Sequence, residues 1–370
     1  MIKKIQQDFI YFLHEFKDNY RKGVHRLRTI LASRAQAQAF VSNAGGVAVV
    51  LGYEPSAPDK NAQELYALLA ASPYIDDAVQ TFLGSIYEAG AESKDAMYSD
   101  SARCLEILHD PVMARAAGAG AVSAGKWIAT LAGQSCNLYR DMNAVAASDI
   151  AMTAVAASET AMEAVISSTI ALNAVAASKT AMTAVAANET AMVAVAASRV
   201  AMSAIIGNST ALNAVVTSSV AMTAVINNAA ALNAVVSSST AMTAVAASST
   251  AMAAIANNKT AITAVEASAV AKNALYNSPL KTSISNIAST SSWTTRRNGK
   301  IWLISFRQTW SSGNTSMQHR STLKDGGTVS CTASQSYNTD YRIDRFMDSI
   351  TNYNSAGGIG NVCTYYFIPC

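Results

Sequence analysis

The chain has 370 residues and a formal net charge of +3, and 14% of its residues are charged. This length is sufficient for two or three ordinary domains. Apolar stretches are all broken well before the roughly 18 residues that a membrane-spanning helix needs. No apolar segment with a small-residue cleavage site follows Met1, so we expect neither a signal peptide nor membrane insertion.

Residues 1–34 are predicted to form an amphipathic helix. Their apolar residues recur at steps of three or four, the spacing of one helix face. A seam of bulky aromatics suits packing on another helix, so this element is expected to seed an oligomer or dock on a larger body. The predicted attachment and oligomerisation residues are Ile2, Ile5, Phe9, Phe12, Phe16 and Tyr20. We interpret the basic cluster at 21–28 as a solvated helix face and expect no nucleic-acid partner.

Residues 35–140 are predicted to form a helical attachment module. Short polar residues that favour helix starts precede several apolar-periodic segments. The predicted starts are Asp59, Ser72-Pro73, and Ser99 or Asp100. Asp110-Pro111, followed by VMARAA, is interpreted as a degenerate repeat that leads into the regular array.

Residues 141–280 consist of fourteen ten-residue blocks without insertion or deletion. The blocks, here called decads, follow the pattern A-[ML]-x-A-[VI]-x-x-[SN]-x-x. Position four is always Ala, position eight is always Ser or Asn, and position five is Val or Ile except at Leu275. Most charges, such as Glu159 and Arg199, fall at variable positions, which are expected to face water. Because a repeat gives each unit the same contacts, this segment is built to extend.

Three conformations are compatible with the decads. A continuous coiled coil suits Ala and Met, but ten residues fall about 80° short of three full turns, so it would be overwound. Alternatively, the Ser or Asn at position eight caps a new two-turn helix in each decad and the helices stack in a solenoid, which Ser278-Pro279 favours. A β-solenoid or β-prism is the third conformation. We favour helical repeats, with the β form as the alternative.

The decad interior would be lined by Ala with Met or Val, which is little bulk for one chain to bury. Association of parallel copies would add buried surface. We therefore expect a homotrimer, although the ten-residue period of the repeat does not by itself set the number of copies.

Residues 281–370 are predicted to form a small β-rich domain. Asn298-Gly299 is a strong hairpin signal, and an alternating strand follows it. A second turn is predicted at 325–327 and a last strand in the closing segment NVCTYYFIPC. Trp302 and Tyr366 are predicted core residues. This segment has nine basic and four acidic residues, which would steer an acidic partner.

Catalytic and metal motifs are missing from the sequence. The four histidines share no ligand spacing, and there is neither a nucleophile elbow nor a phosphate-binding loop. The five cysteines have no CxxC spacing, so we interpret them as small buried residues, with a disulfide among Cys331, Cys363 and Cys370 as the alternative. We expect no enzymatic activity, no metal and no cofactor.

The C-terminal domain does combine aromatic residues with arginines, as protein surfaces that bind glycans or proteins often do. The predicted ligand-binding or receptor-binding residues are Trp293, Arg296, Arg297, Trp310, Arg320, Tyr337, Tyr341 and Tyr353.

The phrase AMTAVAASST, repeated without gaps between a helical module and a β-rich end, resembles the decapeptide-repeat shafts of tailed-bacteriophage fibre proteins. The resemblance in sequence covers residues 141–280. The N-terminal and C-terminal parts resemble those of such fibres only in their order along the chain. The resemblance implies an elongated multi-domain fibre, usually a homotrimer, assembled in the host cytoplasm and carried on the virion. Its N-terminal part would attach to tail, baseplate or collar proteins, and its C-terminal tip would contact a host surface glycan or protein.

Two other roles share this plan. A collar, whisker or connector fibre would bind other virion proteins instead of a host. A bacterial surface adhesin also has a stalk and a head, but it would require a signal peptide and an anchor. We place the tail fibre first.

Overall fold

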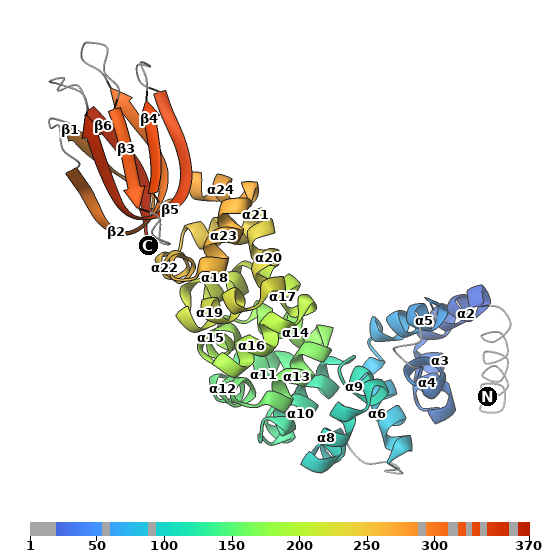
Figure 1. The fold of residues 1–370 in the computed structure, drawn as a ribbon. Coiled ribbons are helices and arrows are strands. Elements are labelled where there is room, and N and C mark those ends of the chain that lie inside the picture. The colour runs from blue at the N-terminus through green and yellow to red at the C-terminus, as the bar shows by residue number, and fades with distance from the viewer. Residues whose placement is uncertain are drawn as a thin grey trace. The chain divides into compact units, whose positions relative to one another are not determined.

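The computed structural model describes residues 20–53, 60–87, 94–287, 294–309, 317–322, 328–333, 339–354 and 362–370. Two compact units divide the chain, Met1–Ala204 and Ile205–Cys370. Helices predominate, and a small antiparallel sheet lies at the C-terminal end (Figure 1). The predicted combination of a mostly helical chain with a small β-rich C-terminal region is therefore confirmed.

The first unit begins with short helices that precede the decads. Asp100 and Asp110 each accept hydrogen bonds from two backbone amides at the start of the following helix, and the start after Asp100 was predicted. Ser72 lies three residues before its helix, which begins at Ile75. The helices are α2 (Tyr20–Ala32), α3 (Arg34–Val41), α4 (Ala44–Leu51), α5 (Lys60–Ala70), α6 (Ile75–Ile86), α7 (Lys94–Tyr98), α8 (Ser101–His109), α9 (Pro111–Ala117) and α10 (Ala121–Leu131).

The predicted single helix over 1–34 is tested only in its second half. Ile2, Ile5, Phe9, Phe12 and Phe16 lie outside the described residues. From Tyr20 the chain is helical to Ala32, and extended backbone at Ser33 separates α2 from α3. Val24 and Leu27 of the predicted seam are buried, and α2 packs on α3 and α5 of the same chain.

A hydrogen-bonded core joins α10 to the helices before it. Trp127 is fully buried, and its indole nitrogen donates to the Cys104 carbonyl at 3.0 Å. The Lys126 ammonium, also buried, donates to the Cys136 carbonyl at 3.1 Å, in a short 3-10 helix at Cys136–Leu138. Cys104 and Cys136 are buried free thiols, as the sequence predicts. These contacts give α10 a fixed position from which the decads continue.

Each decad forms one short helix that begins directly after the residue at position eight. In nearly all of them the Ser or Asn at that position accepts a hydrogen bond from the Ala amide three residues on, for example Ala161 to Ser158 at 3.2 Å. The helices of the first unit are α11 (Met142–Ala147), α12 (Asp149–Ala157), α13 (Glu159–Ser167), α14 (Thr169–Ala177), α15 (Lys179–Ala187), α16 (Glu189–Ala197) and α17 (Arg199–Ile206), which ends in the second unit.

The second unit continues with the same short helices. They are α18 (Ser209–Thr217), α19 (Ser219–Asn227), α20 (Ala229–Ser237), α21 (Ser239–Ala246), α22 (Ser249–Ala256), α23 (Lys259–Ala267) and α24 (Ala269–Tyr276). Of the three conformations considered, only the capped short helices correspond to these elements. The interpretation of Ser278-Pro279 was wrong: Ser278 accepts from the Leu280 amide, but a turn and strand β1 follow instead of a helix.

Within each unit, a decad helix packs on the third helix that follows it, as α12 does on α15 and α21 on α24. Several capping serines connect these layers with a second hydrogen bond. Ser268 Oγ donates to the Val236 carbonyl at 2.7 Å, and Ser178, Ser248 and Ser278 donate likewise to the carbonyl 32 residues earlier. One hydroxyl thus starts a helix and fixes it to the end of a helix in the preceding layer.

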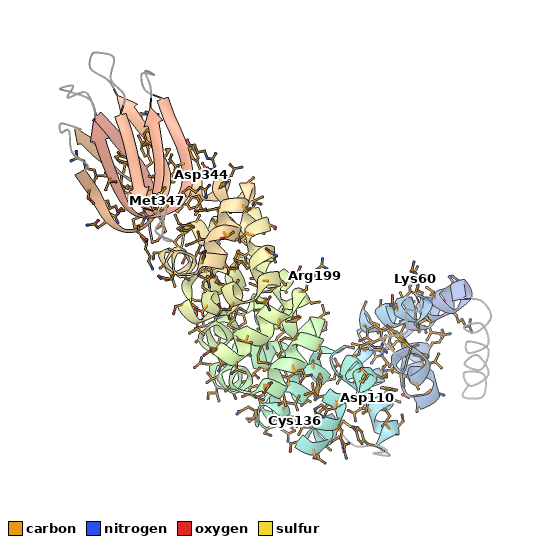
Figure 2. The ribbon with its side chains drawn as sticks, in the orientation of Figure 1. Lys60, Asp110, Cys136, Arg199, Asp344 and Met347 are labelled. Atoms are coloured by element: carbon orange, nitrogen blue, oxygen red, sulfur yellow. The ribbon has the colours of Figure 1, made fainter. Side chains whose placement is uncertain are left out.

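Decad positions one, two and five are buried, whereas positions three and nine face solvent. Met152, Met192 and Met242 are each fully buried within one chain. The predicted charged residues Glu159, Glu163, Lys179, Glu189 and Arg199 are exposed, and Arg199 points away from the helices in Figure 2. Because stacking within one chain buries these apolar positions, their burial does not depend on a second copy. The burial of these positions therefore gives no support for a trimer, which stays a prediction.

The second unit ends in one six-stranded sheet in which all neighbours are antiparallel. Its order is β1-β6-β2-β5-β3-β4, and the central strands β2 and β5 are long and curved (Figure 1). The last strand of the chain was predicted and is confirmed as β6. The strands are β1 (Thr282–Ile287), β2 (Thr294–Thr309), β3 (Met317–Thr322), β4 (Thr328–Ala333), β5 (Thr339–Asn354) and β6 (Val362–Pro369).

The predicted hairpin at Asn298-Gly299 was wrong, because both residues lie inside β2. Gly299 has φ +105°, and the β2–β5 register shifts between Asn298 and Ile301. A β-bulge needs the same left-handed glycine conformation as a tight turn. The local signal was therefore correct for backbone conformation and wrong for topology.

The sheet core consists of buried Ile301, Leu303, Phe306, Met347, Ile350, Tyr365 and Phe367. A second register shift, between Leu303 and Ser305, brings Phe306 into the same cluster as Leu303 despite their odd spacing. Trp302 is fully buried, as predicted. Tyr366 is only partly buried, and its neighbour Tyr365 is the core residue instead.

Candidate functional site

The eight predicted ligand-binding residues are only partly placed by the structure. Trp293, Trp310 and Tyr337 lie outside the described residues. Strand register places Arg320 of β3 opposite Thr351 and Tyr353 of β5 opposite Gln318, whereas Tyr341 lies near the other end of β5, opposite Phe306. The sheet therefore brings Arg320 and Tyr353 to neighbouring positions and separates Tyr341 from them.

Arg296 and Arg297, the two predicted binding residues in β2, are partly buried. The Arg297 guanidinium lies 4.6 Å from the centre of the Phe367 ring, a cation–π distance, and this phenylalanine belongs to the sheet core. Its Nε atom is buried and lacks a hydrogen-bond partner among the described atoms. Arg297 therefore packs against the core, and its polar end is enclosed.

A polar cluster missed by the sequence prediction connects the last two decad helices to the sheet. Glu266 of α23 uses both carboxylate oxygens: one accepts from the Arg345 side chain at 2.7 Å and the other from the Phe346 amide at 3.0 Å. The Glu266 side chain is 14% exposed, so water screens this pair less than a surface ion pair. Glu266 thus fixes the backbone of β5 to the decads.

Helix α24 completes the cluster through contacts with Arg342 of β5. The guanidinium of Arg342 lies 5.0 Å from the centre of the Tyr276 ring and donates to the Asn273 side chain at 3.3 Å. Lys281 covers the same ring at 4.8 Å. The Tyr276 ring thus lies within cation–π distance of both Arg342 and Lys281 at the end of the decads.

Asp344 is the most strained and most buried acid of the cluster. Its φ of +52° is unusual for a residue with a side chain, and the residue is 7% exposed (Figure 2). Arg342 donates to one carboxylate oxygen, and the other has no partner among the described atoms. Burial raises the pKa of Asp344, although Arg342 and Lys272 partly oppose that shift.

These contacts coincide with departures from the decad pattern. Lys272 occupies position two, which is Met, Leu or Ile in the other decads, while Glu266 and Tyr276 occupy position six, elsewhere Ala, Val or Ile. Terminal units of repeat arrays often carry such polar substitutions because one face no longer meets another repeat. The departures were visible in the sequence and indicate which decads meet a different element.

We expect Asp344→Asn to remove a pH dependence of the second unit. Because the folded-state pKa is raised, the acid binds its proton more tightly when folded, and its ionisation costs stability as pH rises through that range. Asparagine keeps the shape and tolerates positive φ. Urea unfolding from pH 3.5 to 7 should show the variant gaining stability relative to the native chain as pH rises. Asp348→Asn, on the same strand, is the control, and a pH-independent difference for Asp344→Asn would contradict this assignment.

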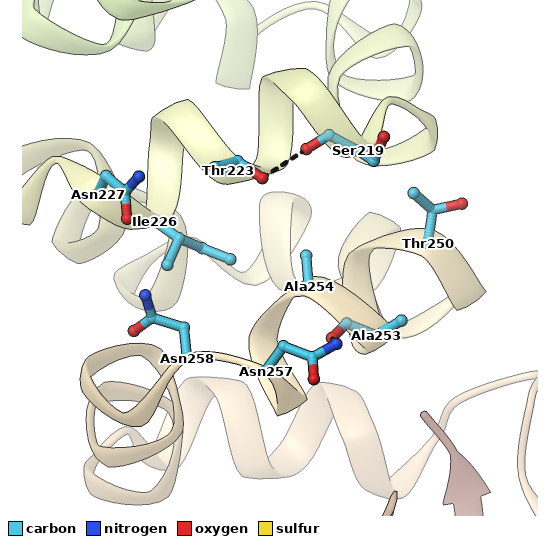
Figure 3. A pocket seen from close by; sticks show the side chains of 9 residues that line it. All are labelled: Ser219, Thr223, Ile226, Asn227, Thr250, Ala253, Ala254, Asn257 and Asn258. Atoms are coloured by element: carbon cyan, nitrogen blue, oxygen red, sulfur yellow. Dashed lines mark hydrogen bonds between the residues drawn. The ribbon is translucent and has the colours of Figure 1, made fainter.

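A groove of about 440 Å³ lies between α19 and α22 (Figure 3). Thr223 donates to the Ser219 carbonyl at 2.8 Å, and Asn257 donates to the Ala253 carbonyl at 2.8 Å. The lining is uncharged and offers hydroxyl and amide groups, which suit a neutral polar ligand. It consists of Ser219, Thr223, Ile226, Asn227, Thr250, Ala253, Ala254, Asn257 and Asn258.

Two Asn-Asn pairs, at 227–228 and 257–258, are the only ones in the decads and lie three decads apart. Since each helix packs on the third one after it, the stacking brings Asn227 of the first pair to the same groove as Asn257 and Asn258. The spacing was visible in the sequence, but its meaning depended on the number of helices in a layer.

The part of the chain that the structure describes contains no group of three or more His, Cys, Asp and Glu residues able to hold a metal. Burial raises the pKa of the Cys104 and Cys370 thiols to about 12. In that same part, no single helix has the length and apolarity to cross a membrane, although five bent pairs of successive decad helices meet both criteria together.

Comparison with known proteins adds no relative. No protein-family model matches this chain, and no curated protein sequence matches it.

Proposed function

We propose that this chain is a structural fibre protein of a tailed-phage virion, in which the decads act as a spacer and the C-terminal sheet as the contact domain. The N-terminal helices, to about residue 110, attach the fibre to tail, baseplate or collar proteins. The proposal gives the chain a mechanical role and no enzymatic activity or cofactor. Assembly takes place in the host cytoplasm.

The observation that carries the spacer role is the repeated use of one hydroxyl for two bonds. Ser178 and Ser248 each cap a helix and donate to the carbonyl 32 residues earlier. Because the capping bond recurs in nearly every decad and the bond between layers recurs in several, decads can be added without new kinds of contact, and their number sets the length. Packed helices lie about 10 Å apart, so each set of three decads would add about 10 Å.

Non-repeating contacts at both ends of the decads support the proposal. Ser158 and Ser168 are too early in the array to meet an earlier decad, and they donate to the carbonyls of Leu131 and Gly118 instead. At the other end, Glu266 binds β5. Each end is therefore fastened to a different module, as a spacer between an attachment part and a contact part requires.

The contact domain is proposed to bind a host surface glycan or protein through the end of the sheet where Arg320 and Tyr353 lie. Self-association into a homotrimer stays part of the proposal. Only the fibre resemblance supports it. Decad packing does not, because the decads bury their apolar positions within one chain.

Immunogold labelling of infected cells and released particles, with an antibody against the full chain, tests the proposal. We expect gold on the virion tail. Gold at the virion neck would favour the collar or whisker fibre, and gold on uninfected bacterial surfaces would favour the adhesin. Label confined to the cell interior, with none on particles, would contradict all three. Particles from an unrelated phage serve as the control for antibody specificity.

A further inference from the structure

The sheet has two outer strands, and both have an open edge among the described residues. β1 pairs only with β6, and β4 pairs only with β3. Each outer strand has six residues. An open edge presents a row of backbone donors and acceptors that another strand can pair with.

Neither outer strand carries the residues that normally prevent such pairing. Their sequences, TSISNI and TVSCTA, contain no charge and no proline. Lysine, inward-pointing charge and proline are the usual means by which edge strands avoid association. Instead, Thr, Val and Ile favour strand pairing, and Ser283 and Ser285 of β1 are exposed.

The strand directions determine which edges can meet. All neighbours are antiparallel and the sheet has six strands, so β1 and β4 run in opposite directions. A second copy in the same orientation therefore brings its β1 antiparallel to β4 of the first copy and continues the sheet. Pairing β1 with β1 would require one copy to be turned over, and its decads would point the opposite way.

We propose that copies of this chain associate head to tail, with β1 of each copy paired antiparallel to β4 of the next. This interface joins two different surfaces, so it forms a ring where the rotation that relates successive copies closes about one axis. All copies then keep their decads on the same side of the ring, as a fibre with parallel chains requires. The inference deepens the proposed self-association by naming the surface that produces it.

The experiment places one lysine on either edge of the full-length chain. Ser283→Lys blocks β1, Thr332→Lys blocks β4, and Thr295→Lys, at an exposed position of the central strand β2, is the matched control. Sedimentation equilibrium measures the mass against 38.6 kDa for one chain. Circular dichroism verifies folding, and Ser283→Glu with Ser330→Glu is a second pair if a lysine variant unfolds.

We expect the native chain and Thr295→Lys to be oligomers and each edge variant to be a single chain. An equimolar mixture of the two edge variants should form a two-copy complex and nothing larger, because it contains one intact β1 and β4 pair. This rescue separates head-to-tail pairing from like-with-like pairing, in which one edge variant stays dimeric and mixing adds nothing.

Two results would overturn the inference in different ways. Oligomers that persist in a folded edge variant, or edge variants that fail to combine on mixing, would remove edge pairing and leave self-association in place. A monomeric native chain would contradict both edge pairing and self-association. The immunogold result would still decide whether the protein belongs to the virion.

Discussion

Gly125→Ala is expected to destabilise the first unit by about 3 kcal/mol, at the upper end of the cost of overpacking a core. A Cβ atom at Gly125 would lie 2.4 Å from both the Asp141 carbonyl carbon and the Met142 nitrogen. These are backbone atoms at the start of the first decad helix, so no side-chain rotation can relieve the overlap. Helix α10 would have to move away from α11, and the decads would lose their fixed start.

Gly45→Ala, in α4 of the same unit, is the matched control. The nearest atom to its Cβ would be Asn43 Oδ1 at 3.5 Å, which is ordinary contact. Replacing a helical glycine by alanine without strain stabilises by up to about 1 kcal/mol. Urea unfolding followed by circular dichroism compares the two variants. Equal stabilities would show that α10 and α11 are not in the close contact described.

Ser168→Ala should cost the first unit about 2–4 kcal/mol, much more than an ordinary capping serine. Ser168 is 2% exposed, accepts from the Ala171 amide at 3.1 Å and donates to the Gly118 carbonyl at 2.7 Å. Alanine removes the cap, worth about 1 kcal/mol. It also leaves a buried carbonyl without a partner, which costs about 1–3 kcal/mol.

Ser198→Ala separates the two contributions. Ser198 accepts from the Ala201 amide at 3.3 Å, with no carbonyl contact among the described hydrogen bonds. We expect it to cost about 1 kcal/mol, the value of a cap. Hydrogen exchange measured by mass spectrometry should show faster exchange across both α9 and α14 in Ser168→Ala and only around α17 in Ser198→Ala. Similar effects of both variants would reject a layer-joining role for the hydroxyl.

The predictable features are those that depend on residues close together in the sequence. A capping residue acts on amides two or three positions away, so Asp100, Asp110 and the decad serines could be identified from local chemistry. The abrupt change to Thr, Tyr and Trp after the decads likewise indicated strands. The exposed positions of Glu159 and Arg199 followed from their variability within a repeat.

The candidate site was largely unpredictable because it depends on long-range contacts. Glu266 meets Arg345 across 79 residues, and Arg297 turns toward Phe367 and away from solvent. Aromatic and arginine content alone does not distinguish a binding surface from a core. The better signal was the departure of Glu266, Lys272 and Tyr276 from the decad pattern. Residues of a repeat depart from its pattern where the repeat contacts a different kind of element.

The sequence by itself determined the length of the repeat, the Ser or Asn that could cap a helix in each decad and the variable positions that meet water, because cap and periodicity act within ten residues. Only the tertiary structure decided that three helices make one layer, that one chain buries its own Met and Val side chains, and that Asn298-Gly299 is a bulge. Each of these depends on which distant segment lies alongside. For Gly299 the two topologies need the same positive φ, so only the β2–β5 register distinguishes a bulge from a hairpin.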